Sequence, residues 1–75
     1  MPNPFSDFTT IYFEDPLHEN NTLKILTIDG HLIREYQNIR EKELKIQREK
    51  MSNGIYFFQL FSDRRLIAVG KFIIE

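Results

Sequence analysis

The stretch TLKILTIDGHLIREY, residues 22–36, decides the fold class. It contains two runs rich in β-forming residues, 22–28 and 31–36, and Asp29-Gly30 separates them. Asp-Gly between two such runs is a strong hairpin signal, because a type I′ turn needs a positive φ at both central positions. We therefore predict an antiparallel hairpin with a type I′ turn over these residues.

Another strand is expected on the N-terminal side of this hairpin. Residues 9–13, TTIYF, are rich in β-forming side chains and are followed by Asp15-Pro16, a combination that ends a strand. The polar residues 17–21 are then expected to form a loop that leads into the hairpin.

The last third of the chain predicts two more strands. Residues 52–54, SNG, indicate a turn that enters the nearly continuous apolar run 55–61. A second turn is expected at 62–65 and a final strand at 66–74. Gly70 interrupts that strand, which indicates a bulge or a close backbone approach.

Two signals disagree over residues 38–51. Nearly all side chains there are good helix formers, so propensity alone favours a helix. However, Leu44 and Ile46 are two residues apart, and no apolar stripe with helical spacing runs through the segment. Alternation from Glu43 to Arg48 fits a strand with one charged face, and we favour the strand.

The pattern as a whole comprises six short strands at hairpin spacing and no convincing helix. It predicts an all-β protein, specifically an antiparallel β-sandwich. Some strands place apolar residues on both faces, for example Ile25 with Leu26 and Phe57 with Phe58. Packing two sheets uses one face of each, so we expect the remaining apolar surface to meet a partner.

Length and composition set limits on the function. Seventy-five residues make a single small domain (1–75), and the chain has no cysteine to form a disulfide or a thiolate metal site. Ten basic and eleven acidic residues nearly cancel, so no nucleic-acid partner is expected. No apolar stretch has the length of a membrane span, and no export signal opens the chain. If the protein works outside the cytoplasm, we therefore expect the chain to be a fragment whose export signal lies elsewhere.

The sequence offers little for catalysis or metal binding. His18 lies among exposed carboxylates, but one histidine is a poor ligand set for zinc. No serine, histidine and aspartate are spaced as an activated nucleophile would require. The basic residues of 42–50 alternate with glutamates, which indicates a solvated mixed-charge face. We expect no enzyme, no metal and no cofactor.

Five short motifs extend over the whole chain: residues 2–5 (PNPF), 9–13 (TTIYF), 28–34 (IDGHLIR), 51–57 (MSNGIYF) and 70–74 (GKFII). Each motif alone is weak. In this order and at this spacing, the five together resemble the C-terminal sorting domain of proteins exported by the type IX (Por) secretion system.

This resemblance implies an Ig-like β-sandwich of about seven strands that acts as a secretion address. It implies recognition by outer-membrane components of the secretion system, an N-terminal cargo domain, and removal by a sorting peptidase. The route is through the periplasm to the cell surface or the medium. Glu75 departs from the basic or amide residue that ends many members, and Met1 is expected to be absent from the parent protein.

Seven residues of these motifs are predicted to take part in partner recognition, and each has a structural alternative. The prolines can instead fix how the chain enters the domain, and the glycines can instead allow the backbone conformation that their positions need. The tyrosine hydroxyl can hydrogen-bond to the main chain, and the lysine can protect an edge strand from aggregation. Residues 70–74 are expected at or near a sheet edge, where a partner strand could add. The seven are Pro2, Asn3, Pro4, Gly54, Tyr56, Gly70 and Lys71.

A second function from a different class stays open at this point. The chain could be a small cell-surface β-sandwich module that binds carbohydrate or protein and is retained on the mature protein. The lack of tryptophan argues mildly against sugar stacking. Self-association through exposed strand edges is a further possibility for either function.

Overall fold

The structure is a computed structural model, and it describes residues 7–12 and 21–75. Within these residues the chain is all-β, with six strands and no helix. Residues 2–4, Phe13 and the expected loop 17–20 lie outside the described part. The strands are β1 (Phe8–Tyr12), β2 (Asn21–Thr27), β3 (Leu32–Tyr36), β4 (Glu43–Gln47), β5 (Gly54–Ser62) and β6 (Arg65–Ile74).

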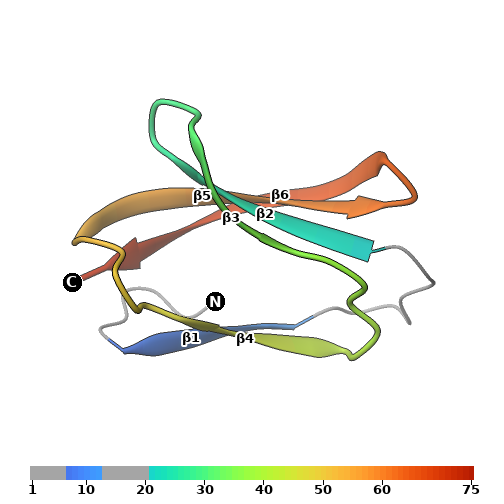
Figure 1. Cartoon of the computed structure of the whole chain (residues 1–75), viewed down its shortest axis with the longest axis horizontal. Coiled ribbons are helices and arrows are strands. Elements are labelled where there is room, and N and C mark those ends of the chain that lie inside the picture. The colour runs from blue at the N-terminus through green and yellow to red at the C-terminus, as the bar shows by residue number, and fades with distance from the viewer. Residues whose placement is uncertain (1–6, 13–20) are drawn as a thin grey trace.

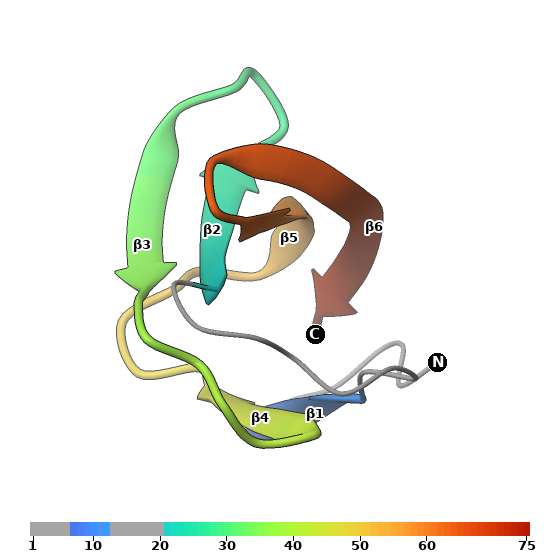
Figure 2. The ribbon, with the colours of Figure 1, turned by 90° about the vertical axis from the view of Figure 1, so that its right-hand side faces the viewer.

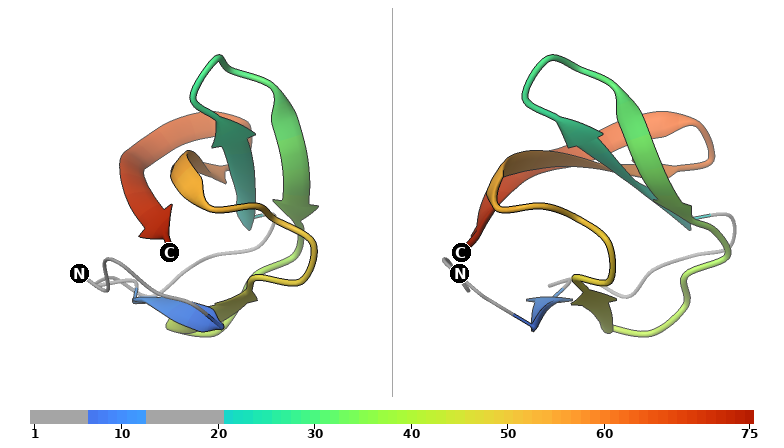
Figure 3. Two further views of the ribbon diagram at one scale, coloured as in Figure 1. Left: turned by 90° about the vertical axis from the view of Figure 1, so that its left-hand side faces the viewer. Right: turned by 60° about the vertical axis from the view of Figure 1, so that its left-hand side comes forward.

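The strands form two antiparallel sheets. One sheet has the order β3-β2-β5-β6, and the other is the pair β1-β4. Figure 1 shows the four-stranded sheet above the β1-β4 pair, and Figure 3 shows the same arrangement from two further sides. β6 is strongly curved, so that its C-terminal end turns toward the smaller sheet (Figure 2).

The two sheets share one hydrophobic core. β2, β5 and β6 supply most of it, and Ile46 of β4 is fully buried against them. Because successive strand residues point to opposite faces, the buried hydrophobic residues lie two positions apart in β2 and β6 and four positions apart in β5. The buried hydrophobic residues are Leu23, Ile25, Ile39, Ile46, Met51, Tyr56, Leu60, Phe72 and Ile74.

The strand prediction for residues 38–51 is confirmed over Glu43–Gln47. Ile46 is buried and Leu44 is half-buried, whereas the charged residues between and beside them are exposed. The helix-forming propensity of this segment is overridden because alternation is the only pattern that places both apolar side chains on one face.

The hairpin at residues 22–36 is confirmed, but the predicted type I′ turn at Asp29-Gly30 is wrong. The loop has three residues: Gly30 N donates to Thr27 O at 2.9 Å, and Thr27 N donates to His31 O at 2.9 Å. Gly30 has a φ of 90°, whereas Asp29 is not among the positive-φ residues. This is a turn followed by one left-handed glycine, and the Thr27 hydroxyl stabilises it by hydrogen bonding to the Asp29 carboxylate.

The predicted turn at 62–65 is confirmed. In contrast to the first hairpin, this one has a two-residue loop with a positive φ at both central positions. Asp63 and Arg64 have φ values of 51° and 71°, and Ser62 pairs with Arg65. The bulge expected at Gly70 is wrong: the register shifts where Phe61 pairs with Leu66 and Leu60 with Ala68, which makes Ile67 the extra residue. The alternative expectation for Gly70, a close backbone approach, is not met in that form either, because the nearest atoms belong to the Phe58 side chain.

The strand number expected from the family resemblance also needs correction. The described residues contain six strands and not about seven. Six is the number of β-forming runs in the sequence itself, so the residue pattern gave the better count.

Candidate partner-recognition site

Four of the predicted recognition residues come together on one pair of strands. Gly54 and Tyr56 lie on β5, Gly70 and Lys71 lie on β6, and the two strands are antiparallel neighbours. The pairs are Gly54 with Ile74, Tyr56 with Phe72, Phe57 with Lys71, and Phe58 with Gly70. Pro2, Asn3 and Pro4 lie outside the described residues.

Tyr56 faces the core. Only 6% of its surface is exposed, and its ring stacks on Phe72 with a centroid distance of 5.7 Å. Its hydroxyl donates to the main-chain oxygen of Ser52 at 2.7 Å, so the polar tip of a buried ring is satisfied within the preceding turn. The tyrosine therefore fixes the entry of the chain into β5.

The two glycines meet different requirements. Gly54 has a φ of 150°, and a Cβ built there would meet nothing within 4 Å, so the requirement is conformational. At Gly70 the requirement is space, because the ring of Phe58 lies over the glycine where a Cβ would be. A close neighbour is therefore present at Gly70, but it is an aromatic side chain of the neighbouring strand and not the backbone that was expected.

Lys71 points to the opposite face of the sheet from Tyr56. It is exposed and pairs with Phe57, which is itself 38% exposed. β6 is an edge strand of the four-stranded sheet, as predicted for residues 70–74. The ladder therefore has a structural side, which carries Tyr56 and the Phe58–Gly70 contact, and an accessible side, which carries Lys71.

Two arginines that the sequence did not single out connect parts of the fold that lie far apart in the chain. Arg34 of β3 donates to the Tyr36 hydroxyl at 3.0 Å and to the main-chain oxygens of Gln47 and Arg48, which lie at the end of β4. Arg34 thus ties the larger sheet to the smaller one.

Arg48 continues this connection toward β6. Its guanidinium donates to Met51 O at 3.0 Å, to Glu75 O at 3.2 Å and to the side chain of Asn53. Arg34 stood within a motif and was thus detectable. Arg48 looked like one member of a mixed-charge run, because a sequence does not reveal which main-chain oxygens a side chain will reach.

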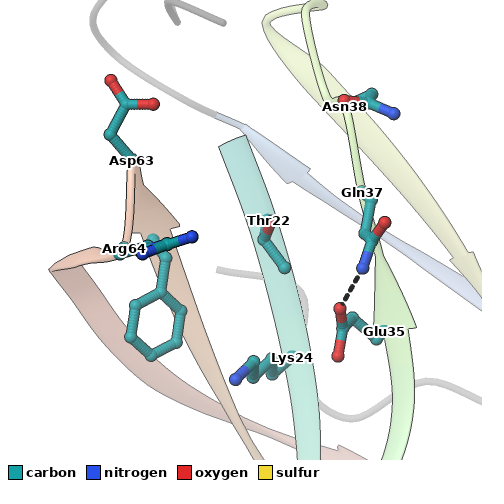
Figure 4. A pocket seen from close by; sticks show the side chains of 8 residues that line it. Thr22, Lys24, Glu35, Gln37, Asn38, Asp63 and Arg64 are labelled. Carbon is teal, nitrogen blue, oxygen red and sulfur yellow. Dashed lines mark hydrogen bonds between the residues drawn. The ribbon is translucent and has the colours of Figure 1, made fainter. Parts of the chain in front are cut away.

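Two shallow hollows lie on the outer side of the four-stranded sheet. The polar hollow in Figure 4 joins side chains from β2, β3, β5 and the β5–β6 turn. Within it, Gln37 donates to Glu35, and Lys24 Nζ lies 4.9 Å from the centroid of the Phe61 ring. The second hollow is apolar, with Leu26, Phe57 and Val69 in its lining and Lys71 beside them.

The described residues show one clear perturbation of acidity. The pKa of Asp29 is held below its ordinary value of 3.8, first by the hydrogen bond from Thr27, then by a main-chain hydrogen bond and the nearby His31. His31 Nδ1 lies 3.4 Å from the Asp29 carboxylate, and both side chains are largely exposed. This perturbation belongs to the β2–β3 turn and stabilises that loop.

In residues 7–12 and 21–75 no three histidine, cysteine, aspartate or glutamate side chains are placed to hold a metal ion. In the same part of the chain, no helix has the length and apolar character needed to cross a membrane.

The fold and the site define a small all-β domain whose candidate residues occupy two adjacent strands at a sheet edge. Comparison with protein families gives a match over residues 1–75 to the secretion system C-terminal sorting domain, and the chain belongs to this family. No curated protein and no solved structure gives a significant match.

Membership in this family settles the principal function. The domain is a C-terminal sorting signal of the type IX secretion system, and it directs an exported protein to the cell surface or the medium. The family is not an enzymatic one, and its role implies interaction with the secretion machinery and a cargo part on the N-terminal side.

Proposed function

We propose that the secretion machinery reads this domain as a folded unit, through the accessible side of the β5–β6 ladder. The observation that carries the proposal is that Gly54, Tyr56, Gly70 and Lys71, which lie far apart in the sequence, meet on these two strands. In this proposal Lys71 contacts the partner, while the other three hold the two strands in shape. Pro2, Asn3 and Pro4 set how the domain follows its cargo.

We further propose that residues 1–75 form one Ig-like β-sandwich at the C-terminus of a longer exported protein. Two antiparallel sheets that share a core support this architecture. The domain crosses the periplasm, is recognised by outer-membrane components of the secretion system, and is removed by a sorting peptidase at the surface.

Export of a fused reporter in a host with this secretion system tests the proposal. Lys71→Glu should reduce export without lowering the melting temperature, because the side chain is exposed. Lys42→Glu is the matched control, since Lys42 is an exposed lysine outside the ladder. If removal of residues 71–75 left export unchanged, the end of β6 would not be part of the signal.

Tyr56→Phe separates recognition from stability. It removes the hydrogen bond to Ser52 O and should lower the free energy of unfolding by about 1 kcal/mol. At a temperature where the variant stays folded, export should match that of the unchanged chain. A strong loss of export from a fully folded Tyr56→Phe variant would show that the hydroxyl itself is read.

Mass spectrometry of the mature exported protein tests removal of the domain. A sorting domain should be absent from the mature product. A domain still present on it would favour the alternative function, a retained surface module that binds carbohydrate or protein. The polar hollow of Figure 4 would then be the first place to seek a ligand.

A further inference from the structure

The first half of β6 exposes an uninterrupted apolar run. Leu66, Ile67 and Val69 are 49%, 47% and 66% exposed, and Ala68 is exposed as well. Ala68 pairs with the buried Leu60 and so lies on the core side of the sheet, yet it remains accessible. Both faces of β6 are therefore open over these four residues, beside the β5–β6 turn at the right of Figure 1.

Positive charges stand at both ends of this run. Arg64 and Arg65 precede it and Lys71 follows it, and all three are exposed. β6 itself, Arg65–Ile74, contains no acidic residue. Residues 64–71 contain no acidic residue either, and the nearest in the sequence are Asp63 and Glu75.

This charge pattern disfavours a second copy of the chain as the occupant. If two copies paired antiparallel through residues 66–69, Arg64 of each copy would lie opposite Lys71 of the other. If they paired parallel, each cation would meet its own counterpart. Like charges placed directly opposite each other on neighbouring strands destabilise the pairing.

The bulge at Ile67 limits how a partner can bind. It interrupts the regular ladder, and bulges on edge strands hinder the addition of a long continuous strand. Contacts to the side chains of Leu66 and Val69 therefore contribute more than main-chain hydrogen bonds. The cationic ends then fix the position of the partner by charge complementarity.

We propose that residues 64–71 bind an extended segment of another protein with an apolar centre and carboxylates at both ends. Arg64, which lines the hollow on the outer side of the sheet, and Lys71 are seven positions apart, a span of at most about 23 Å at a rise of about 3.3 Å per residue, and the bulge and the curvature of β6 shorten it. The partner's carboxylates should be separated by about the same length. That this partner belongs to the secretion machinery rests on the function proposed above, whereas its chemistry follows from β6.

A pair of synthetic peptides tests the chemistry. The probe is a fluorescein-labelled peptide of sequence Glu-Glu-Val-Thr-Ile-Val-Glu-Glu, and its counterpart carries lysine in place of each glutamate. Fluorescence anisotropy at low ionic strength should show at least about tenfold tighter binding of the acidic peptide, and added salt should reduce the difference. Equal binding of the two peptides, or binding of neither, would overturn the proposal.

Charge reversal locates the binding to β6. The double variant Arg64→Glu, Arg65→Glu should lose the preference for the acidic peptide. Arg65→Glu alone is a second test, because Arg64 has a positive φ in the turn and Arg65 does not. Lys42→Glu with Lys50→Glu is the charge-matched control and should keep the preference, since both lysines are exposed and lie outside β6. Val69→Ser should weaken binding of the acidic peptide severalfold. An unchanged preference in the folded Arg64→Glu, Arg65→Glu variant would refute the proposed site.

Two further measurements separate the possible failures. Sedimentation equilibrium that showed a dimer abolished by Val69→Ser would make a second copy the occupant and refute the proposal. Failure of the unchanged chain to export a reporter would refute the proposed function but leave the peptide result standing. Export by the unchanged chain together with equal binding of both peptides would refute only the present inference.

Discussion

Replacing Gly70 with alanine should destabilise the domain because of one aromatic ring. The three atoms nearest to a Cβ at position 70 would be Cζ, Cε2 and Cε1 of Phe58, and they lie too close for the ring to stay where it is. Overpacking of this kind costs about 1–3 kcal/mol. Alanine in place of glycine in a strand recovers about 0.5–1 kcal/mol, because the unfolded chain loses less entropy. The net loss should therefore be at most about 2.5 kcal/mol.

A double-mutant cycle isolates the ring's contribution. Leucine lacks all three of those atoms, so in a Phe58→Leu background Gly70→Ala should be neutral or slightly stabilising. The coupling energy between the two positions should be about 1–3 kcal/mol. Gly54→Ala is the control: its cost comes from a φ of 150° and not from a contact, so it should be the same in both backgrounds.

Urea unfolding followed by circular dichroism measures all of these variants. For a domain of this size each kcal/mol corresponds to about 4–8 °C in melting temperature, which gives an independent check. If Gly70→Ala has the same cost with phenylalanine and with leucine at position 58, then the ring is not the reason for the glycine. Gly70 would then be required for a reason other than space.

Three further predictions concern the rest of the fold. Arg48→Lys keeps the positive charge but loses the several guanidinium N–H donors that reach Met51 O and Glu75 O. Amide hydrogen exchange should therefore accelerate near Glu75, at the end of β6, more than in β2. Uniform acceleration would contradict this local role. Asn21→Leu should lower the free energy of unfolding by about 1–3 kcal/mol, as measured by urea unfolding. The buried Asn21 side chain donates to Ile39 O at 3.1 Å, and the variant removes this donor. A neutral result would contradict the contact. Asp29 has a lowered pKa in the folded state, so its stabilising contribution is present above its ordinary pKa of 3.8 and is lost as the pH falls through the folded-state value. A carbon-13 NMR titration of Asp29 that gave a value at or above 3.8 would contradict this.

Local pattern was enough to predict most of the strands. Alternation around Leu44 and Ile46 favoured a strand over a helix, and the turn residues at 29–30 and 62–65 placed two hairpins correctly. Turn geometry was harder to predict. In the first hairpin the Thr27 hydroxyl hydrogen-bonds to Asp29 within a three-residue loop, so the expected type I′ backbone is absent there. Positive φ values at both central positions occur instead at Asp63 and Arg64.

The candidate site was predictable in part. Motif order identified Gly54, Tyr56, Gly70 and Lys71, but no local signal says that the first three serve the core while the last faces outward. Arg48 could not be found at all from the sequence, because its acceptors are main-chain oxygens brought near it by folding.

The sequence by itself determined the all-β class, the strand positions and membership in the sorting-domain family, since these depend on residue type and spacing along the chain. Only the tertiary structure decided the pairing of β5 with β6, the place of β6 at a sheet edge, and the exposure of Leu66 to Val69 between cations. Pairing and exposure depend on contacts between residues far apart in the chain. A periodic pattern specifies which side chains share a face, but it does not specify which face another sheet will cover.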